Sequence, residues 1–158
     1  MGNNHRRDKL IKEREGDSYR LKGKLAEPTV CPYCSLSYQK GRWQWAEAPK
    51  DAHKVTCPAC QRTQDKLPAG VVTLAGEFMQ KHKREVIGLI KNIEENENKQ
   101  HPLNRIMEMN EQGNEITITT TDTHLPRSIG VALEKAYKGE LDYQFTDESN
   151  MLRVRWSR

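Results

Sequence analysis

The stretch CPYCSLSYQKGRWQWAEAPKDAHKVTCPAC, residues 31–60, contains all four cysteines of the chain in two Cys-x-x-Cys pairs. Two such pairs, separated here by 22 residues, are typical of one tetrahedral site with four thiolate ligands. Four soft thiolates favour zinc, and a site closed by four protein ligands has no open position for a reacting water. We therefore predict a structural Zn²⁺ ion, with the ligands Cys31, Cys34, Cys57 and Cys60.

The same residues allow other chemistry. The motif CPYC alone is typical of a glutaredoxin-type redox dithiol, but no helical pattern follows Cys34, as that fold requires. Iron in a rubredoxin-like site would use the same four ligands. Disulfides are disfavoured because no export signal is visible. His53 lies four residues before Cys57 and could replace one cysteine ligand, although a surface strand position is the simpler interpretation.

The residues around the cysteine pairs predict a zinc ribbon over residues 28–76. Short β-type runs at 36–38, 42–45 and 54–56 are separated by Gly, Pro and Asp residues, and a run at 71–74 adds one more strand. We expect each Cys-x-x-Cys pair to occupy the turn of a hairpin, with the two turns facing each other across the ion.

Residues 77–158 carry the pattern of a small domain of helices on a sheet. Apolar residues at helical spacing predict a helix over 77–95, and Pro102 suits the first turn of a short helix that ends at Met109. The alternating, β-branched run EITITTT predicts a strand. A second long helix follows, for which Asp122 or Thr123 can serve as the cap.

The hairpin at 141–156 is the most specific structural expectation in this domain. Leu141, Tyr143 and Phe145 alternate with polar residues, and apolar residues alternate again after the turn TDESN. Pairing 145 with 152 places every apolar side chain on one face and sets Asp142 opposite Arg155. The predicted fold is therefore α+β, with a four-cysteine zinc ribbon followed by helices on a three-stranded sheet.

The composition of the 158 residues is polar, with 35% hydrophobic and 30% charged residues and a mean hydropathy of −0.92. Residues 1–27 contain eight basic and five acidic residues without a sustained period, which predicts a disordered basic arm that could order on a polyanion. No apolar run approaches the ~18–20 residues of a membrane span. The start MGNNHRRDKL lacks the apolar core of a secretory signal, so we expect a cytoplasmic protein without membrane contact.

Catalytic motifs are absent from the sequence, which contains no GxGxxG, phosphate loop, GxSxG or HExxH pattern. The five histidines are scattered. His82 is expected on the apolar face of its helix, and His124 is expected to cap or pack at the start of the later helix. We therefore expect no enzymatic activity and no small-molecule substrate.

Basic and aromatic residues are interleaved between Tyr38 and Trp45. Aromatic rings can stack on unpaired bases while Lys and Arg hold phosphates, so this pattern favours RNA. The alternative is that Trp43 and Trp45, which share one face of the predicted strand, only build the small core of the ribbon. The predicted RNA-binding residues on the ribbon and on the later helix are Lys40, Arg42, Trp43, Lys54, Arg62, Arg127 and Lys135.

Four segments together resemble a known family: the CPYC and CPAC pairs, TDTHLPRSIG at 121–130, AYKGEL at 136–141 and RVRW at 153–156. They are similar to a family of small prokaryotic zinc-ribbon proteins, related to the N-terminal region of the nonsense-mediated-decay-type adaptor that escorts the large ribosomal subunit. The resemblance covers roughly residues 28–158 and implies a ribosome- or RNA-associated protein with a structural zinc. The family's zinc ligands are the cysteines of such Cys-x-x-Cys pairs, called knuckles. This role carries over to Cys31, Cys34, Cys57 and Cys60. The resemblance does not extend to the later domains of the adaptor, so we do not expect its shuttling and export functions here.

The leading hypothesis is a cytoplasmic, non-catalytic zinc-ribbon protein that binds RNA on the ribosome through its basic arm and ribbon. The alternative is a protein–protein interaction module, either a regulator or an adaptor. Salt dependence separates the two, because neutralised phosphates make affinity fall steeply between ~50 and ~200 mM salt.

Overall fold

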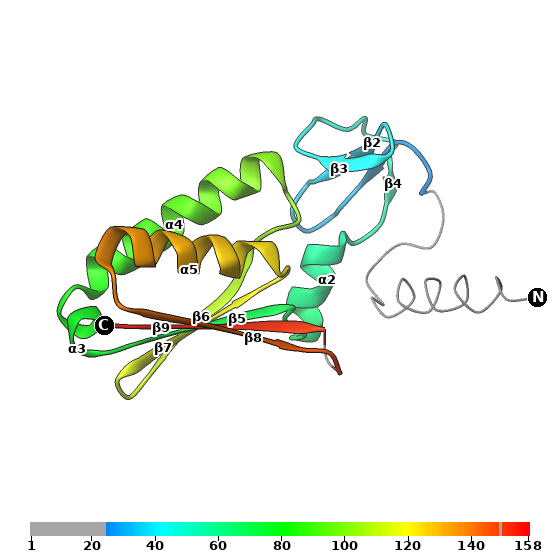
Figure 1. Cartoon of the computed structure of the whole chain (residues 1–158). Coiled ribbons are helices and arrows are strands. Elements are labelled where there is room, and N and C mark those ends of the chain that lie inside the picture. Colours follow the sequence, from blue (N-terminus) through cyan, green and yellow to red (C-terminus); the bar gives the residue numbers. More distant parts are fainter. Residues whose placement is uncertain (1–24, 149) are drawn as a thin grey trace, which may run out of the picture.

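The computed structural model describes residues 25–148 and 150–158. Figure 1 shows a small sheet beside a larger sheet with helices on one of its faces. All but the last three residues of the predicted basic arm, 1–27, lie outside the described residues. Among the described residues, no helix combines the length and the hydrophobicity needed to span a membrane.

The smaller sheet is built from four short strands in the order β3-β2-β1-β4. The strands are β1 (Thr29–Val30), β2 (Ser37–Gln39), β3 (Arg42–Gln44) and β4 (His53–Lys54). Strand β2 pairs antiparallel with both β1 and β3, whereas β4 pairs parallel with β1. The first cysteine pair lies in the β1–β2 turn, as predicted. The core of the ribbon, formed by this sheet and the residues after it, contains Cys31, Leu36, Trp43, Cys57 and Ala59.

The second cysteine pair departs from the prediction, because it begins a helix and does not occupy a hairpin turn. Helix α2 spans Pro58–Asp65, and Cys57 is its N-cap, with its sulfur accepting a hydrogen bond from the backbone N–H of Cys60. Pro58 suits the first helical position, because its fixed φ angle matches the helix and no donor is lost there. The sulfur of Cys57 therefore points to the N-terminal end of a helix.

The larger sheet has five strands, and the predicted three-stranded sheet is wrong. Its order is β6-β7-β5-β9-β8. The strands are β5 (Gly70–Ala75), β6 (Ile106–Gln112), β7 (Glu115–Thr120), β8 (Glu140–Thr146) and β9 (Met151–Ser157).

Two of these strands change the predicted layout. The run at 71–74 is a strand, but it lies in the middle of the larger sheet, antiparallel to β7 and parallel to β9, and does not extend the ribbon. The predicted short helix at 102–109 is wrong, because strand β6 begins at Ile106 and pairs with β7.

The two long helices lie on one face of the larger sheet, above it in Figure 1, and a short helix lies at the left end of the sheet. They are α3 (Glu77–Lys81), α4 (Lys83–Gln100) and α5 (His124–Tyr137). The helix predicted over 77–95 is thus two helices, divided at His82, whose ring stacks on Phe78 with centroids 4.2 Å apart. The residues between helices and sheet form the main core: Val72, Leu74, Met79, Val86, Ile90, Ile116, Ile118, Leu125, Ile129, Leu133, Leu152, Val154 and Trp156.

The predicted hairpin register is confirmed. Phe145 pairs with Leu152 and Tyr143 with Val154, while Trp156 stands opposite Leu141. The indole of Trp156 is buried and donates a hydrogen bond of 2.7 Å to the carbonyl of Lys138. Polar side chains of this hairpin therefore occupy the face that no helix covers.

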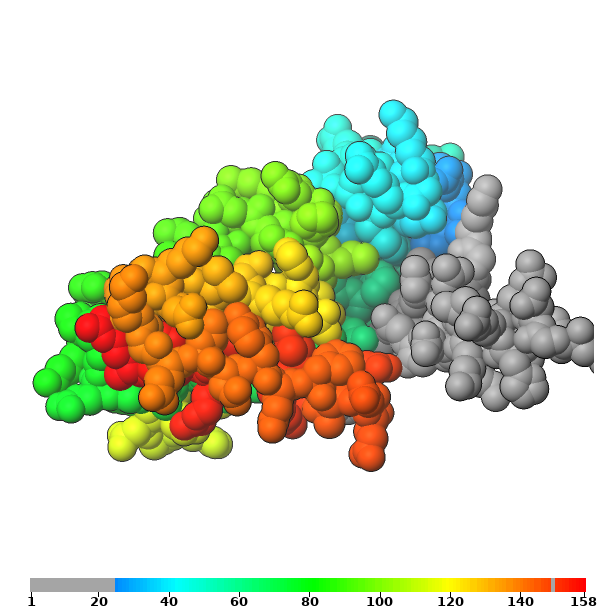
Figure 2. Space-filling model, viewed as in Figure 1, coloured from blue at the N-terminus to red at the C-terminus, as the bar shows by residue number. Residues whose placement is uncertain are grey.

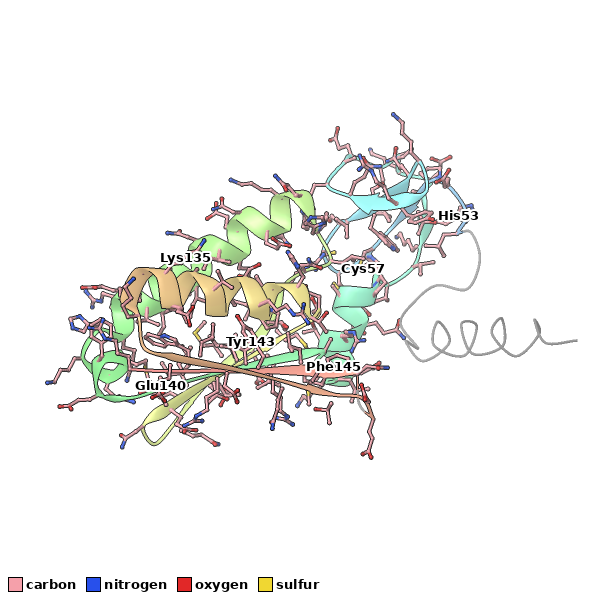
Figure 3. The ribbon with its side chains drawn as sticks, in the orientation of Figure 1. His53, Cys57, Lys135, Glu140, Tyr143 and Phe145 are labelled. Atoms are coloured by element: carbon pink, nitrogen blue, oxygen red, sulfur yellow. The ribbon has the colours of Figure 1, made fainter. Side chains whose placement is uncertain are left out.

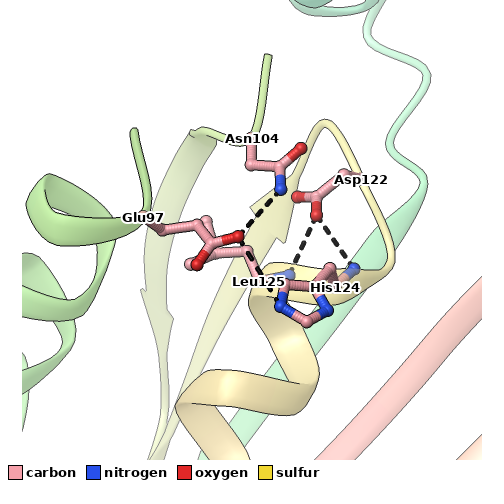
Figure 4. Close-up of polar contacts among 5 residues, drawn as sticks. All are labelled: Glu97, Asn104, Asp122, His124 and Leu125. Atoms are coloured by element: carbon pink, nitrogen blue, oxygen red, sulfur yellow. Dashed lines mark hydrogen bonds and ion pairs between the residues drawn. The ribbon is translucent and has the colours of Figure 1, made fainter. Parts of the chain in front are cut away.

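The start of helix α5 is held by the carboxylate of Asp122. Its Oδ2 accepts hydrogen bonds of 2.9 Å from the backbone N–H groups of both His124 and Leu125, as Figure 4 shows. Thr123 holds the N-cap position but makes no side-chain cap bond, so of the two predicted caps Asp122 supplies the bonding group.

Asp122→Ala is expected to lower the free energy of unfolding by about 1 kcal/mol, because two backbone donors at the start of α5 lose their acceptor. Urea denaturation followed by circular dichroism measures the change. Asp147→Ala, which removes an exposed carboxylate in the β8–β9 turn, is the control and should change the stability little. Equal losses in both variants would contradict the capping role.

Candidate metal centre

The four cysteine sulfurs converge on one point. All four Sγ atoms lie within 4.8 Å of one another, and those of Cys34 and Cys57 are 3.7 Å apart. Four thiolates at ~2.3 Å from a central ion, in a tetrahedron, are about 3.8 Å apart. None of the four cysteines forms a disulfide. The residues therefore fit a tetrahedral metal ion, and among the described residues they are the one such group of three or more potential ligands.

The first pair is shaped by the turn between β1 and β2. The N–H of Cys31 donates to the carbonyl of Leu36 (2.8 Å), and the N–H of Ser35 donates to the carbonyl of Cys31 (2.9 Å). Ser35 has a φ of 66°, which folds the chain back directly after Cys34. This tight turn brings both sulfurs of the pair to the same side.

Backbone amides and burial act on the thiols in opposite directions. Burial raises the pKa of Cys31, but N–H groups of Cys57, Cys34 and Tyr33 outweigh it and bring that pKa down to about 7. Burial raises the pKa of Cys60 to about 11, and it raises the pKa of Cys57 further. The N–H of Cys57 lies 3.3 Å from the sulfur of Cys31. The backbone thus supplies enough partial positive charge to favour the thiolate form of Cys31, whereas burial dominates at Cys57 and Cys60.

The five-stranded sheet and its helices form the larger unit of the protein, residues 70–158. One positive side chain from this unit reaches the sulfur cluster. The guanidinium of Arg105 lies 3.3 Å from Sγ of Cys34, 3.5 Å from Sγ of Cys60 and 4.0 Å from Sγ of Cys57. Burial lowers the pKa of Arg105, but its bond to Cys34 and the nearby sulfur charges raise it overall. Four thiolates around a divalent ion carry a net charge of −2, so this arginine offsets part of that charge.

Arg105 is held in place by the sheet next to it. Its N–H donates to the hydroxyl of Thr121, and its carbonyl accepts from the N–H of Thr121, both at 2.9 Å. Its Nε donates to the carbonyl of Pro102 at 2.7 Å. The guanidinium group of Arg105 is therefore held in place by residues at the start of β6 and the end of β7, which lie outside the ribbon.

Three further contacts join the two units beside the sulfurs. The indole N–H of Trp45 donates to the carbonyl of Asn98 (3.0 Å), and the guanidinium of Arg105 lies 5.4 Å from the Trp45 ring centroid. Leu103 packs against the ribbon core. The candidate metal centre thus lies at the junction of the two sheets. No local sequence signal marks Arg105, because it lies 45 residues beyond Cys60.

The predicted aromatic face divides into two environments. Trp43 is buried in the ribbon core, with its ring edge-on to Tyr38 at 5.4 Å between centroids. Trp45 lies beyond the end of β3 and is 47% exposed. The core role considered for Trp43 matches this location, whereas stacking on a base would require its ring to leave the core.

The predicted basic residues do not form one cluster. Arg42 lies on β3 and Lys54 on β4, which are the two opposite edges of the smaller sheet, and Lys40 lies in the β2–β3 turn. The guanidinium of Arg62 on α2 donates to the carbonyl of Leu67, while Arg127 and Lys135 are exposed on α5.

His53 is not part of the sulfur cluster. It is exposed on β4, whereas Cys57 lies at the start of α2, as Figure 3 shows. Comparisons of the chain with protein-family models, with curated proteins and with solved structures gave no match.

Proposed function

We propose that the protein is a non-catalytic RNA-binding protein whose ribbon is folded around a structural Zn²⁺ ion. The observation that carries the proposal is that three basic side chains of the ribbon are exposed and have no carboxylate partner among the described residues. Lys40, Arg42 and Lys54 are exposed, and none of the described residues forms an ion pair with them. Unpaired surface cations are available to phosphates without a carboxylate to displace.

Three cations of the larger unit, by contrast, are paired with carboxylates. Lys83 pairs with Glu111, Lys81 with Glu77 at 3.3 Å, and Arg155 with Glu115 at 2.8 Å. Binding a phosphate to these side chains would first break an ion pair. These three side chains are therefore less available to RNA than the exposed ribbon cations. Lys91 and Lys99 on α4 are exposed like the ribbon cations, so substituting them tests whether the ribbon itself is the binding surface.

Tyr33 is the side chain best placed to stack on a base. It lies between Cys31 and Cys34 and is 66% exposed. It takes the stacking role first assigned to Trp43, whose ring is buried. An exposed ring on a rigid, metal-held turn can stack on an unpaired base of any identity.

Zinc is the ion proposed for the cysteine site, since four thiolates in a tetrahedron favour it over harder divalent cations. The ion would be held by all four sulfurs and would order the ribbon without taking part in a reaction. Iron, the alternative for the same ligands, would colour the protein, whereas zinc would not.

Binding of a fluorescein-labelled, mixed-sequence single-stranded RNA is the test, measured by anisotropy between 50 and 200 mM salt. The expected affinity falls linearly with salt on logarithmic axes. The double variant Lys40→Gln/Arg42→Gln is expected to reduce the slope by about 1.4, since each lost phosphate contact contributes about 0.7 for single strands.

The matched control is Lys91→Gln/Lys99→Gln, which removes the same charge from exposed positions on α4. Its slope should equal that of the wild type. Absence of RNA binding, or equal slopes in all three proteins, would contradict the proposal. Purified ribosomal subunits are a second probe, because the family resemblance implies the ribosome. A protein partner retained after nuclease treatment would favour the alternative interaction module.

A further inference from the structure

Strand β8 is an open edge of the five-stranded sheet. Among the described residues, 25–148 and 150–158, its one neighbour is β9, with which it pairs along all seven of its residues, Glu140–Thr146. Natural proteins usually protect such edges with charged side chains (especially lysine), with proline, with a bulge or with a covering segment; the charged residues of β8, Glu140 and Asp142, lie on the opposite face from its apolar residues. The opposite edge, β6, has a bulge between Ile106 and Glu108. Strand β8 contains no proline or lysine and pairs with β9 without a register shift.

The unpaired backbone groups of β8 belong to its apolar residues. The N–H groups of Leu152 and Arg158 bond to Ala69 and Ala75, so alternate residues of β9, beginning with Leu152, point their backbone to β5. Arg153 and Arg155, which alternate with these residues, therefore point their backbone groups to β8. There they pair with Gln144 and Asp142. By the same alternation, the residues of β8 that point their N–H and C=O groups to solvent are Leu141, Tyr143 and Phe145.

The side chains at this edge are unusually exposed for their type. Tyr143 is 43% exposed and Phe145 is 52% exposed, although both belong to the face of the sheet that the helices cover. Figure 3 shows Tyr143 below α5 and Phe145 farther to the right along the same strand, and Figure 2 shows the β8 region in orange on the near face of the molecule. Val131 on α5 is also 42% exposed. An exposed apolar strip along an unpaired strand is typical of an interface.

We propose that β8 pairs antiparallel with β8 of a second copy of the chain, about a two-fold axis through Tyr143. The strand is self-complementary in this register. Leu141 would face Phe145 of the second copy, Tyr143 would face itself, and Asp142 would face Gln144. No like charges stand opposite one another, and the two five-stranded sheets become one.

Every outward-pointing backbone group finds a partner in this arrangement. The three residues of each copy that point outward, Leu141, Tyr143 and Phe145, meet their counterparts as hydrogen-bonded pairs. A register shift of two residues would leave some of these groups unpaired. A second copy therefore satisfies this edge fully with the sequence that it already has.

Charges on α5 are also complementary under the same two-fold rotation. Gly130 lies above the strand, because a Cβ atom there would be 2.9 Å from Leu141 and 3.5 Å from the Tyr143 hydroxyl. Arg127 and Glu134, one on each side of Gly130, both act electrostatically on that hydroxyl. The rotation reverses the direction of α5 in the second copy, so Arg127 of one copy lies on the side of Glu134 of the other.

Sedimentation equilibrium of the full chain, with its metal bound, tests the assembly over a range of concentrations from 1 to about 200 µM. The wild type is expected to reach twice the chain mass of 18.3 kDa. Phe145→Lys should remain at the single-chain mass, since it places a charge opposite Leu141 of the second copy. Gln144→Lys, one residue away, would face Asp142 and should keep the double mass.

Disulfide trapping tests the register. In the proposed pairing the Cα atoms of the two Tyr143 residues would be ~5.5 Å apart, within the range of a disulfide. Tyr143→Cys is therefore expected to cross-link to a second copy under mild oxidation. Phe145→Cys should not cross-link, because its symmetry mate would lie about 13 Å along the strand.

Either of two results would overturn the inference. One is a wild type that stays at the single-chain mass up to the highest concentration. The other is a Phe145→Cys cross-link in the absence of a Tyr143→Cys cross-link. Circular dichroism of each variant confirms that the chain is folded. The inference is independent of the proposed RNA binding, because Phe145→Lys leaves the ribbon cations unchanged.

Discussion

The Cys57→Ser variant is expected to lose its metal ion and to unfold the ribbon, while the five-stranded sheet stays folded. The sulfur of Cys57 is fully buried, lies 3.7 Å from that of Cys34 and caps α2. A serine hydroxyl does not replace a thiolate ligand, and apparent binding energies of structural zinc reach about 10–16 kcal/mol in zinc-finger peptides. The sheet has a separate core, so its amides should keep their protection.

Metal analysis and amide hydrogen exchange measure the two effects. The wild type should contain one zinc ion per chain, and Cys57→Ser should contain none. Exchange in the variant should become fast in β1–β4 and α2 but stay slow in β5. Removal of the ion from the wild type with a chelator should reproduce this pattern. Tyr33→Ser, in the other knuckle but with no ligand atom lost, is the control and should keep its ion.

A different outcome would point to the redox alternative. That alternative predicts a Cys31→Ser variant that stays folded but loses a reducible Cys31–Cys34 disulfide. A wild type without bound metal, together with this behaviour, would exclude the structural-metal role.

Arg105→Met is expected to weaken metal binding by about 10–100-fold, the usual cost of losing a partner in the outer shell of a metal site. The methionine keeps much of the packing volume but removes the donors to Cys34 and Cys60. It also removes the guanidinium that lies near Trp45, so the ribbon should separate more readily from the larger unit. Competition with a chromophoric chelator measures the affinity.

Arg105→Lys separates charge from geometry. Lysine keeps the positive charge but lacks the planar fork that reaches two sulfurs at once, so an intermediate affinity is expected. Arg153→Met on the exposed face of β9 is the control for the loss of one arginine. Equal affinities for Arg105→Met and this control would show that Arg105 does not support the site.

Three parts of the structure were accessible from the sequence because their signals are local. The cysteine spacing predicted the convergence of the four sulfurs, and alternation predicted the register of β8 with β9 residue by residue. The start of α5 was also predicted, since a carboxylate two residues before a helix is a strong local signal. The second knuckle was missed as a helix start, although Pro58 directly after Cys57 was the signal that could have revealed it.

The short helix predicted at 102–109 rested on Pro102, and the bulge in β6 hides the alternation that would have marked a strand. The register shifts between Ile106 and Glu108, so Ile106 pairs with Thr120 while Met109 pairs with Ile118. Both therefore belong to the same face although they are three residues apart. Three-residue spacing of apolar side chains is the mark of a helix, and a bulge imitates it.

The contacts between residues far apart in the chain were not accessible from the sequence. Strand β5 is buried on both faces, and a continuous apolar run does not show which strands lie beside it. The role of Arg105 depends on how β6 meets the ribbon, a contact between residues far apart in the chain. Such a side chain becomes recognisable as part of the site only once the topology is known.

The pairing of β5 with β9 has a consequence for synthesis of the protein. All four cysteines precede β5, so the ribbon can take up its ion while the rest of the chain is still being translated. Leu74 of β5 pairs with Trp156 of β9, which is synthesised 82 residues later. Translation of those residues takes roughly 4–16 s at ~5–20 residues per second. During that interval a strongly apolar strand has no partner on one side. The ribbon can therefore be folded before β9 exists, with the apolar strand β5 directly behind it in the nascent chain.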